Sequence, residues 1–434
     1  MENPELIRQE IMALVAKYHR ARFGGEAAIK RVPVSGKVFD EKELQYGVGA
    51  VLDGWWTEGK ISRRFEKSLS RFLGLKHCLV VNSGSSANLL ALTALTSHVL
   101  GERRIQPGDE VITVAAGFPT TVNPILQVGC VPVFCDVLPA THNLDPSQLN
   151  AALSSKTKAV FLAHTLGNPF DLKAVRAFCD QHDLWLIEDN CDALGSRYNN
   201  RFTGTFGDLA TVSFYPAHHI TMGEGGVVLT QDDTLAKIVR ALRDWGRDCY
   251  CPTGKDNTCG KRFGWKLGDL PEGYDHKYIY AELGYNLKNT DLNVALGLAQ
   301  LDKLQGFIEK RKANFAALSA LFEPWSDRFE LPQATPNSDP AWFGFPLSLR
   351  ADCGFSRNAV INHLEGDGIA TRLVFAGNLT RQPYFARGEY SYRVATTLTQ
   401  TDRVMNDAFW IGVYPGLDQR HFEIVAESLR RFFN

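Results

Sequence analysis

The sequence lacks an excess of charge of either sign. Its 434 residues include 47 lysines and arginines against 48 aspartates and glutamates, which gives a formal net charge of −1. Binding to nucleic acid or to an anionic membrane surface is favoured by a basic excess. The balance therefore argues against both as partners, although a local basic patch could still bind the phosphates of a nucleotide.

The sequence also lacks an apolar run long enough to cross a bilayer, for which about 20 consecutive residues are needed. Its first 23 residues, MENPELIRQEIMALVAKYHRARF, carry acidic residues early and apolar residues at helical spacing. This pattern predicts an amphipathic helix and not a signal peptide. We therefore expect a cytoplasmic protein.

The nine cysteines are an odd number and are scattered along the chain. In a cytoplasmic protein, thiols stay reduced and serve mostly as small hydrophobic residues of the core. The cysteines predicted to be core residues are Cys78, Cys130, Cys135, Cys179 and Cys353. The other four are Cys191, Cys249, Cys251 and Cys259.

Short apolar segments alternate with helical segments along the first half of the chain. The predicted strands are 77–81, 109–115, 130–137, 158–165, 184–189 and 209–215. This alternation predicts an α/β fold with a mostly parallel central sheet flanked by helices. We expect an N-terminal helical segment (1–40), a large domain (41–305) with an irregular Cys-rich loop (246–278), and a small C-terminal α+β domain (306–434).

Ligands of parallel sheets bind beyond the carboxyl ends of the strands. This rule places residues 82–86, Phe118, 164–168, Asp189 and 215–218 around one crevice. The segment NSGSSAN (82–88) joins a strand to a helix, where backbone N–H groups and the helix dipole favour a phosphate. It is neither a Walker loop nor a dinucleotide fingerprint, so a plain strand-to-helix turn remains the alternative.

Six motifs together resemble the DegT/DnrJ/EryC family of sugar aminotransferases, which use pyridoxal phosphate. Their order and spacing match that family from about residue 40 to the end. The resemblance implies a fold-type-I aminotransferase-like domain that binds pyridoxal or pyridoxamine phosphate. The motifs are SGSSAN (83–88), GFPTTVNP (117–124), GNPFD (167–171), IEDNCDALGS (187–196), SFYPAHHITMGEGG (213–226) and GYNLKNTDLNVALGLAQLDKL (284–304).

The resemblance also implies how the cofactor is held. Asp189 would pair with the pyridine nitrogen and keep it protonated. Phe118 would stack on the ring, and Asn168 would lie near its hydroxyl group. From the residues alone, a turn for Asp189 and a core position for Phe118 remain open. The implied phosphate contacts are Gly84, Ser85, Ser213 and, from the neighbouring subunit of a homodimer, Asn286.

The segment 213–226 departs from the family where the cofactor lysine is expected, because His218 stands there. No lysine lies between Arg201 and Leu235 to replace it. Tyr215 stands where the family usually has His. Asp192 stands where the family usually has His or Gln. We therefore expect pyridoxamine 5′-phosphate, or pyridoxal phosphate, to be held noncovalently.

These departures, together with Asp189, make up the predicted catalytic set. His218 would act as the base, because imidazole, with a pKa near 6.5, suits proton removal from the cofactor's methylene carbon. A histidine packed in an inactive relic is the alternative, and we expect His219 to be structural. The catalytic residues are predicted to be His218, Asp189, Tyr215 and Asp192.

Four cysteines form the pattern C-x57-C-x-C-x7-C, at Cys191, Cys249, Cys251 and Cys259. This pattern resembles the [2Fe–2S] ligand set of the CDP-4-keto-6-deoxyglucose 3-dehydrases. Zinc, or buried thiols without a metal, remain alternatives. Cys191 is two residues from Asp189, so their α-carbons are at most ~7 Å apart. We therefore expect the cluster beside the cofactor ring.

The resemblance implies removal of the C3 hydroxyl of a CDP-linked 4-keto-6-deoxy sugar, in the biosynthesis of 3,6-dideoxyhexoses of lipopolysaccharide O-antigen. The cofactor amine would condense with the C4 ketone. An NAD(P)H-dependent flavin or iron–sulfur reductase would supply two electrons through the cluster. Arg372, Arg393 and Arg403 are candidate diphosphate contacts. A cluster-free colitose-type 4-keto-6-deoxymannose 3-dehydratase and a non-catalytic iron–sulfur scaffold remain alternatives.

Overall fold

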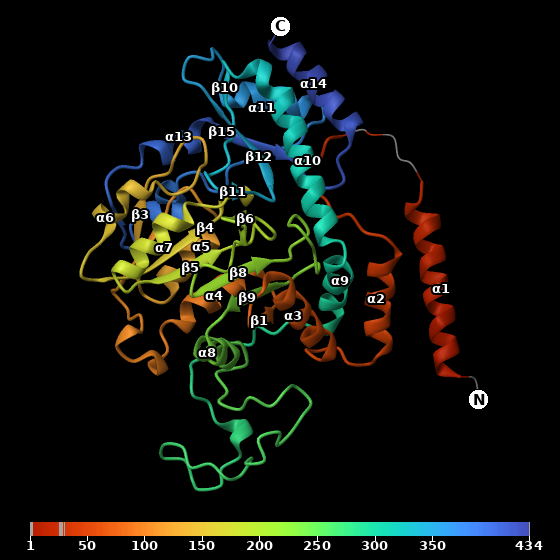
Figure 1. Ribbon diagram of the computed structural model, residues 1–434, viewed down its shortest axis with the longest axis vertical. Coiled ribbons are helices and arrows are strands. Elements are labelled where there is room, and N and C mark those ends of the chain that lie inside the picture. Colours follow the sequence, from red (N-terminus) through yellow and green to blue (C-terminus); the bar gives the residue numbers. More distant parts are fainter. Residues whose placement is uncertain (1–2, 26–28, 30, 434) are drawn as a thin grey trace.

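The computed structural model describes residues 3–25, 29 and 31–433. Figure 1 shows a central sheet with helices on both faces, a smaller sheet above it, and a lobe of irregular chain below it. No helix in the described ranges is both long enough and apolar enough to cross a membrane.

The central sheet has eight strands in the order β1-β9-β8-β5-β4-β2-β3-β14. The strands from β8 to β14 in this order run parallel, and β9 pairs antiparallel with both β1 and β8. The predicted mostly parallel sheet is therefore confirmed. Its strands are β1 (His77–Val81), β2 (Glu110–Val114), β3 (Val131–Cys135), β4 (Thr157–Ala163), β5 (Trp185–Asp189), β8 (Leu209–Ser213), β9 (Gly226–Thr230) and β14 (Arg393–Val394).

Successive side chains of each strand enter different cores, because they point to opposite faces of the sheet. In β4, Phe161 packs in a core with α4 and α8, whereas Val160 and Leu162 pack in a core with α7. The helices of this part are α2 (Glu41–Leu52), α3 (Lys60–Leu73), α4 (Gly84–Ala94), α5 (Pro119–Gln127), α6 (Leu149–Ala152), α7 (Leu172–Gln181), α8 (Asp233–Arg243) and α9 (Asp291–Leu301).

The C-terminal part has its own sheet, in the order β10-β12-β15-β13, and its own apolar core. It also gives β14 to the central sheet, and Ile369 bridges to Val32 of the N-terminal segment. Its elements are α10 (Leu304–Phe322), β10 (Phe329–Glu330), β12 (Gly344–Leu349), α11 (Arg357–Gly366), β13 (Thr371–Leu373), α12 (Pro383–Ala386), α13 (Thr399–Asp407), β15 (Ala408–Gly412) and α14 (Gln419–Phe433).

Two smaller features complete the fold. The N-terminal helix α1 (Pro4–Phe23) lies against α2, where Arg8 pairs with Asp53 at 2.9 Å. A three-stranded sheet joins β11 (Ser338–Asp339), β6 (Arg197–Tyr198) and β7 (Arg201–Phe202).

Residues 244–286, between α8 and α9, form the lobe that projects below the central sheet in Figure 1. Its only regular element is a 3₁₀ turn, His276–Tyr278. Two bridges, Asp244 to Asn286 and Arg247 to Tyr280, close its base. The irregular Cys-rich segment expected from the sequence is thus a defined projection from the domain.

Candidate active site

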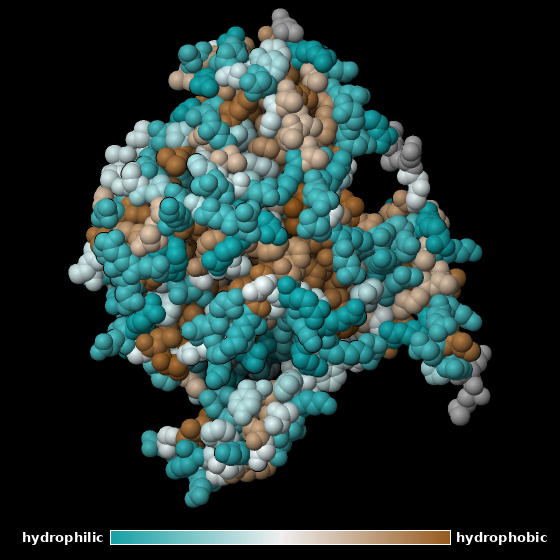
Figure 2. All heavy atoms as spheres, viewed as in Figure 1, coloured by the Kyte–Doolittle hydropathy of each residue, from teal (hydrophilic) through white to brown (hydrophobic). Residues whose placement is uncertain are grey.

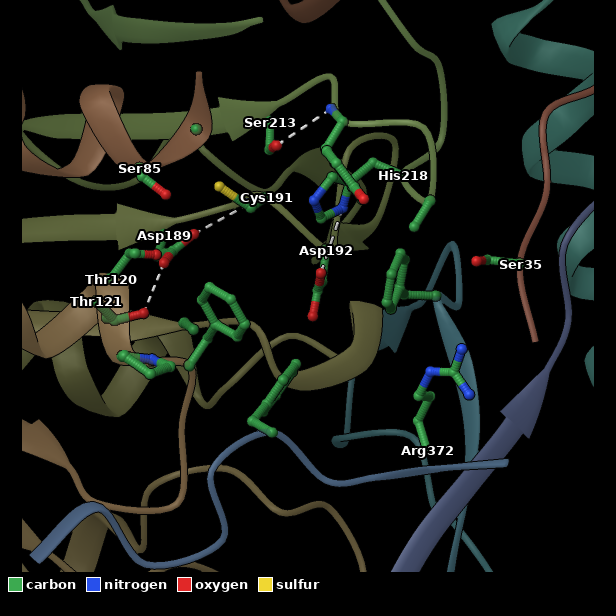
Figure 3. Close-up of a pocket in the computed structure, with 18 of the residues that line it drawn as sticks. Ser35, Ser85, Thr120, Thr121, Asp189, Cys191, Asp192, Ser213, His218 and Arg372 are labelled. Carbon is green, nitrogen blue, oxygen red and sulfur yellow. Dashed lines mark hydrogen bonds and ion pairs between the residues drawn. The ribbon is translucent and has the colours of Figure 1, made fainter. Parts of the chain in front are cut away.

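A pocket of about 810 Å³ lies at the carboxyl ends of β5 and β8. Figure 3 shows side chains from both sheets converging on it. Ten residues predicted from the sequence to be functional line this pocket. They are Gly84, Ser85, Phe118, Asp189, Cys191, Asp192, Ser213, Tyr215, His218 and Arg372.

One end of the pocket suits a phosphate. Helix α4 begins at Gly84, and its N-cap Ser83 accepts a hydrogen bond from the Ser86 N–H at 3.1 Å. The N–H groups of a first helical turn lack intrahelical acceptors and attract anions. A Cβ at Gly84 would lie 2.4 Å from the Cβ of Ser213, so only glycine permits this close approach. Ser213 itself lines the pocket beside this helix start.

Asp189 is held rigidly at the end of β5. One carboxylate oxygen accepts from Asn88 Nδ2 at 2.8 Å and from Thr121 Oγ1 at 2.7 Å, and the other accepts from the Cys191 N–H at 3.2 Å. Thr211 in turn donates to Asn88 Oδ1 at 2.5 Å. Such a carboxylate can hold the protonated nitrogen of a pyridine ring.

Asn88 and Thr121 lie in the motifs SGSSAN and GFPTTVNP, but neither residue was assigned an individual role from these motifs. Asn88→Ala is expected to weaken binding of pyridoxal phosphate about tenfold, because one hydrogen bond to a charged group contributes ~1.5 kcal/mol or more. Titration of the apoprotein by absorbance measures this affinity. Asn123→Ala is the control, since Asn123 accepts from the Tyr384 hydroxyl and does not line the pocket. Equal affinity in both variants would contradict the role of Asn88.

His218 and Asp192 face each other across the pocket wall, with Nδ1 and Oδ1 3.4 Å apart (Figure 3). Burial, and then the positive charge of Arg311, lower the pKa of His218 to about 3. Burial, and then the carboxylate of Asp189, raise the pKa of Asp192 to about 8. At neutral pH the imidazole is therefore an unprotonated base and the Asp192 carboxyl holds a proton.

Arg311 of α10 holds the loop that carries His218. Its side chain is only 1% exposed. The guanidinium donates to the carbonyl oxygens of Ala217 at 3.4 Å and His218 at 3.1 Å, and to those of Trp342 and Phe343, both at 3.3 Å. Phe343 also packs on the His218 ring, with ring centroids 5.1 Å apart. Arg311 therefore joins the base loop to the C-terminal part of the chain.

The mouth of the pocket carries exposed aromatic and basic side chains. Phe118 and Tyr215 are each 52% exposed, which leaves ring faces available for stacking on a bound aromatic group. Arg372 lines the pocket, but Arg393 pairs with Glu110 at 2.8 Å and Arg403 with Glu330 at 2.9 Å. Only the first of the three candidate diphosphate contacts therefore lies at the site.

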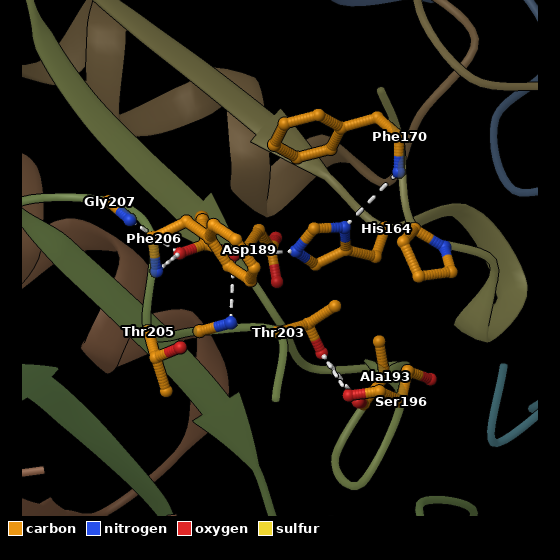
Figure 4. A network of polar contacts seen from close by, with 12 residues as sticks. His164, Phe170, Asp189, Ala193, Ser196, Thr203, Thr205, Phe206 and Gly207 are labelled. Atoms are coloured by element: carbon orange, nitrogen blue, oxygen red, sulfur yellow. Dashed lines mark hydrogen bonds and ion pairs between the residues drawn. The ribbon is translucent and has the colours of Figure 1, made fainter. Parts of the chain in front are cut away.

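Residues 164–168, expected at the crevice, lie in the protein core. His164 Nε2 is 3.0 Å from Glu188, which also accepts from the N–H groups of Phe206 and Gly207 (Figure 4). Asn168 donates to the Gln333 carbonyl at 2.9 Å, and its own side-chain oxygen accepts from a backbone N–H. Both polar groups of Asn168 are thus used in structural bonds, and it does not line the pocket.

The four predicted cluster cysteines do not come together within the chain. Cys249, Cys251 and Cys259 are neighbours in the lobe. Burial is the largest cause that raises the pKa of Cys249, and the thiols of Cys251 and Cys259 raise it further. Cys191 lies instead in the pocket, and its charged neighbours are Asp189 and Asp192. Among the described residues, no group of three or more His, Cys, Asp or Glu side chains is arranged to hold a metal ion.

Asn286, the predicted contact to a neighbouring subunit, lies at the base of the lobe. It bridges to Asp244 and does not line the pocket of its own chain. A phosphate contact by Asn286 would therefore have to be made in another copy of the protein.

Comparison with known proteins agrees with this geometry. The lipopolysaccharide biosynthesis protein RfbH of Salmonella typhimurium is 56% identical over 98% of both chains. The dTDP-4-dehydro-2,6-dideoxy-D-glucose 3-dehydratase of Saccharopolyspora spinosa is 51% identical, over 98% of this chain and 92% of that protein. The structure of E. coli GDP-4-keto-6-deoxy-D-mannose-3-dehydratase with bound hydrated PLP superposes with a TM-score of 0.83 at 27% identity, covering 93% of this chain and 100% of that chain.

The fold-type-I aminotransferase-like architecture predicted from the sequence is thus confirmed. The family model of the DegT/DnrJ/EryC1/StrS aminotransferases matches residues 38–430, which is nearly the whole chain. The chain therefore belongs to the DegT/DnrJ/EryC1/StrS aminotransferase family.

Proposed function

We propose that the protein is a 3-dehydratase of nucleotide-linked 4-keto-6-deoxy sugars, dependent on pyridoxamine or pyridoxal phosphate, in dideoxysugar and lipopolysaccharide biosynthesis. One observation carries this proposal: the described lining of the pocket includes His218 and no lysine. A transaminase of this family needs a lysine to form the Schiff base with pyridoxal phosphate. A base without an amine suits proton removal and loss of a hydroxyl group instead.

The pocket fits the cofactor. The start of α4 with Ser213 suits the phosphate, Asp189 suits the ring nitrogen, and the exposed face of Phe118 suits stacking on the ring. When bound, the cofactor supplies an amine for a ketone and a ring that delocalises negative charge. Asp189 supports that delocalisation because its carboxylate is fixed by three hydrogen bonds.

The remaining chemistry falls to His218 and Asp192. The unprotonated imidazole can accept a proton at the start of the reaction. The carboxyl of Asp192 holds a proton up to a pH of about 8 and can supply it to a departing hydroxyl group. Arg311 keeps His218 in place through the backbone carbonyl of the same residue.

The finer proposal is that the substrate is CDP-4-keto-6-deoxyglucose and that the protein carries a [2Fe–2S] cluster on Cys191, Cys249, Cys251 and Cys259. Removal of the C3 hydroxyl as water, to leave a C3 methylene, takes up two electrons and two protons. An NAD(P)H-dependent flavin or iron–sulfur reductase is the proposed source of the electrons. The three neighbouring cysteines of the lobe support a cluster, whereas the position of Cys191 in the same chain does not.

A cluster-free dehydratase of a GDP-linked sugar is the second candidate, favoured by the similarity to the E. coli structure. A direct assay separates the candidates. The protein, supplied with pyridoxamine phosphate and a chemical reductant, is incubated with CDP- and GDP-linked 4-keto-6-deoxy sugars in turn. We expect mass spectrometry to show loss of one oxygen atom from the CDP-linked sugar. No loss from either sugar, with the cofactor bound, would contradict the dehydratase proposal.

A further inference from the structure

The four cysteines of the proposed cluster are divided between two distant parts of the chain. Cys191 follows β5 and lies in the pocket (Figure 3), whereas the other three lie in the lobe, which projects away from the central sheet (Figure 1). A [2Fe–2S] centre needs all four thiolates within bonding distance of two irons. One chain in this conformation therefore holds two incomplete halves of a site.

Hydrogen bonds to the rest of the chain hold each half in its place. The segment of Cys191 is fixed by the Cys191 N–H bond to Asp189 and by the Asn190 N–H bond to the Thr211 carbonyl at 2.9 Å. The base of the lobe is fixed by the Trp245 N–H bond to the Tyr285 carbonyl at 2.6 Å. Between Cys251 and Cys259, the Thr253 hydroxyl donates to Glu58 at 2.9 Å.

The lobe also has internal bonds that preserve its shape. Arg262 donates to both carboxylate oxygens of Asp275, at 2.9 and 2.6 Å. His276 Nε2 lies 2.5 Å from Asp248. The three thiols are thus presented by a preformed arm and not by a slack loop.

The surface of this arm exposes a set of large aromatic side chains and one leucine. Its exposed large side chains are Trp245, Tyr250, Phe263, Tyr274, Tyr278, Tyr280 and Leu283, the last of them 93% exposed. Figure 2 shows hydrophobic residues among hydrophilic ones on the visible face of the lobe. Aromatic residues exposed together are typical of protein–protein interfaces.

We propose that the cluster site is assembled between two copies of this chain. The lobe of one copy brings Cys249, Cys251 and Cys259 to Cys191 in the pocket of the other. Twofold symmetry makes each copy both donor and acceptor, so that a dimer has two sites. This arrangement rests on the proposed [2Fe–2S] cluster. The occupant of the lobe surface is a second copy because that copy carries the missing fourth thiol.

Mixed dimers test the arrangement. Chains carrying Cys191→Ala and Cys259→Ala are co-expressed with different affinity tags, and the heterodimer is isolated and reconstituted anaerobically with iron and sulfide. If the site forms between chains, one of its two sites has all four cysteines. The heterodimer then holds half the iron and acid-labile sulfide of the wild-type dimer. If the site forms within a chain, each site lacks one cysteine and the heterodimer holds almost none.

The control heterodimer pairs Cys191→Ala with Cys130→Ala, a buried cysteine outside the set. It should hold half the wild-type iron under either arrangement, which shows that a half-filled dimer is stable. The Cys191→Ala and Cys259→Ala homodimers should each hold almost none. A monomer by light scattering, or an iron-free Cys191/Cys259 heterodimer beside an iron-containing wild type, would overturn assembly between chains alone. A wild type that binds no iron would overturn the proposed cluster itself.

Discussion

His218→Asn is expected to lower the rate of C3 hydroxyl loss by about 10²–10⁴-fold, the usual contribution of a general base. Asparagine is similar in size to histidine but cannot take up a proton near neutral pH. Cofactor affinity should remain, because Asp189 and the start of α4 are unchanged. The decisive measurement is single-turnover product formation with saturating pyridoxamine phosphate.

His219→Asn is the matched control, because His219 is also buried but bonds to the Ala341 carbonyl and does not line the pocket. We expect this variant to keep most of the activity. A His218→Lys variant should instead attach pyridoxal phosphate covalently, which borohydride reduction and mass spectrometry detect. Unchanged hydroxyl loss in His218→Asn would exclude His218 as the base.

Arg311→Met is expected to lower the free energy of unfolding by about 4 kcal/mol or more, because each buried acceptor left without a donor costs ~1–3 kcal/mol. Four carbonyl groups lose their donor in this variant. Arg311→Lys keeps the charge but cannot reach all four. We expect it to fold, to bind cofactor normally and to turn over 10–100-fold more slowly, because the base loop is less well positioned.

The pH dependence separates this positioning role from a purely structural one. The positive charge of Arg311 helps to lower the pKa of His218, so its removal should raise that pKa towards 6.5. The acidic limb of the rate profile should therefore move to higher pH in Arg311→Met. Arg243→Lys, a buried arginine paired with Glu58 and Glu66, should lose stability without moving that limb. An unmoved limb in Arg311→Met would contradict an electrostatic effect of Arg311 on the base.

The sequence predicted the sheet well because its strands are short, fully buried apolar runs between helices, a pattern with few alternative folds. It also placed Asp189 and His218 at one site, because strands β5 and β8 are neighbours in a parallel sheet. It did not predict that β14, from the C-terminal part, pairs with β3. Two residues with no strong pattern form that strand, so only the folded chain shows it.

The features of the site that the sequence did not predict depend on tertiary packing, which local residue patterns do not reveal. Arg311 stands in the charged run EKRK of a long helix, which is typical of a solvent-exposed face, yet it is one of the largest fully buried side chains. Residues 164–168 follow a strand of the sheet, but Glu188, which accepts from N–H groups of the 204–207 loop, holds His164 in the core. The spacing of the cysteines gives their number and order but not the path of the lobe.

We propose that this family member removes a hydroxyl group and does not transfer an amino group. Mass spectrometry of the nucleotide sugar formed in one turnover, with pyridoxamine phosphate, reductant and an amino donor present, tests it most directly. The result predicted is a 4-keto sugar that lacks the C3 oxygen and has gained no nitrogen. A 4-amino sugar that retains its C3 hydroxyl would contradict the claim.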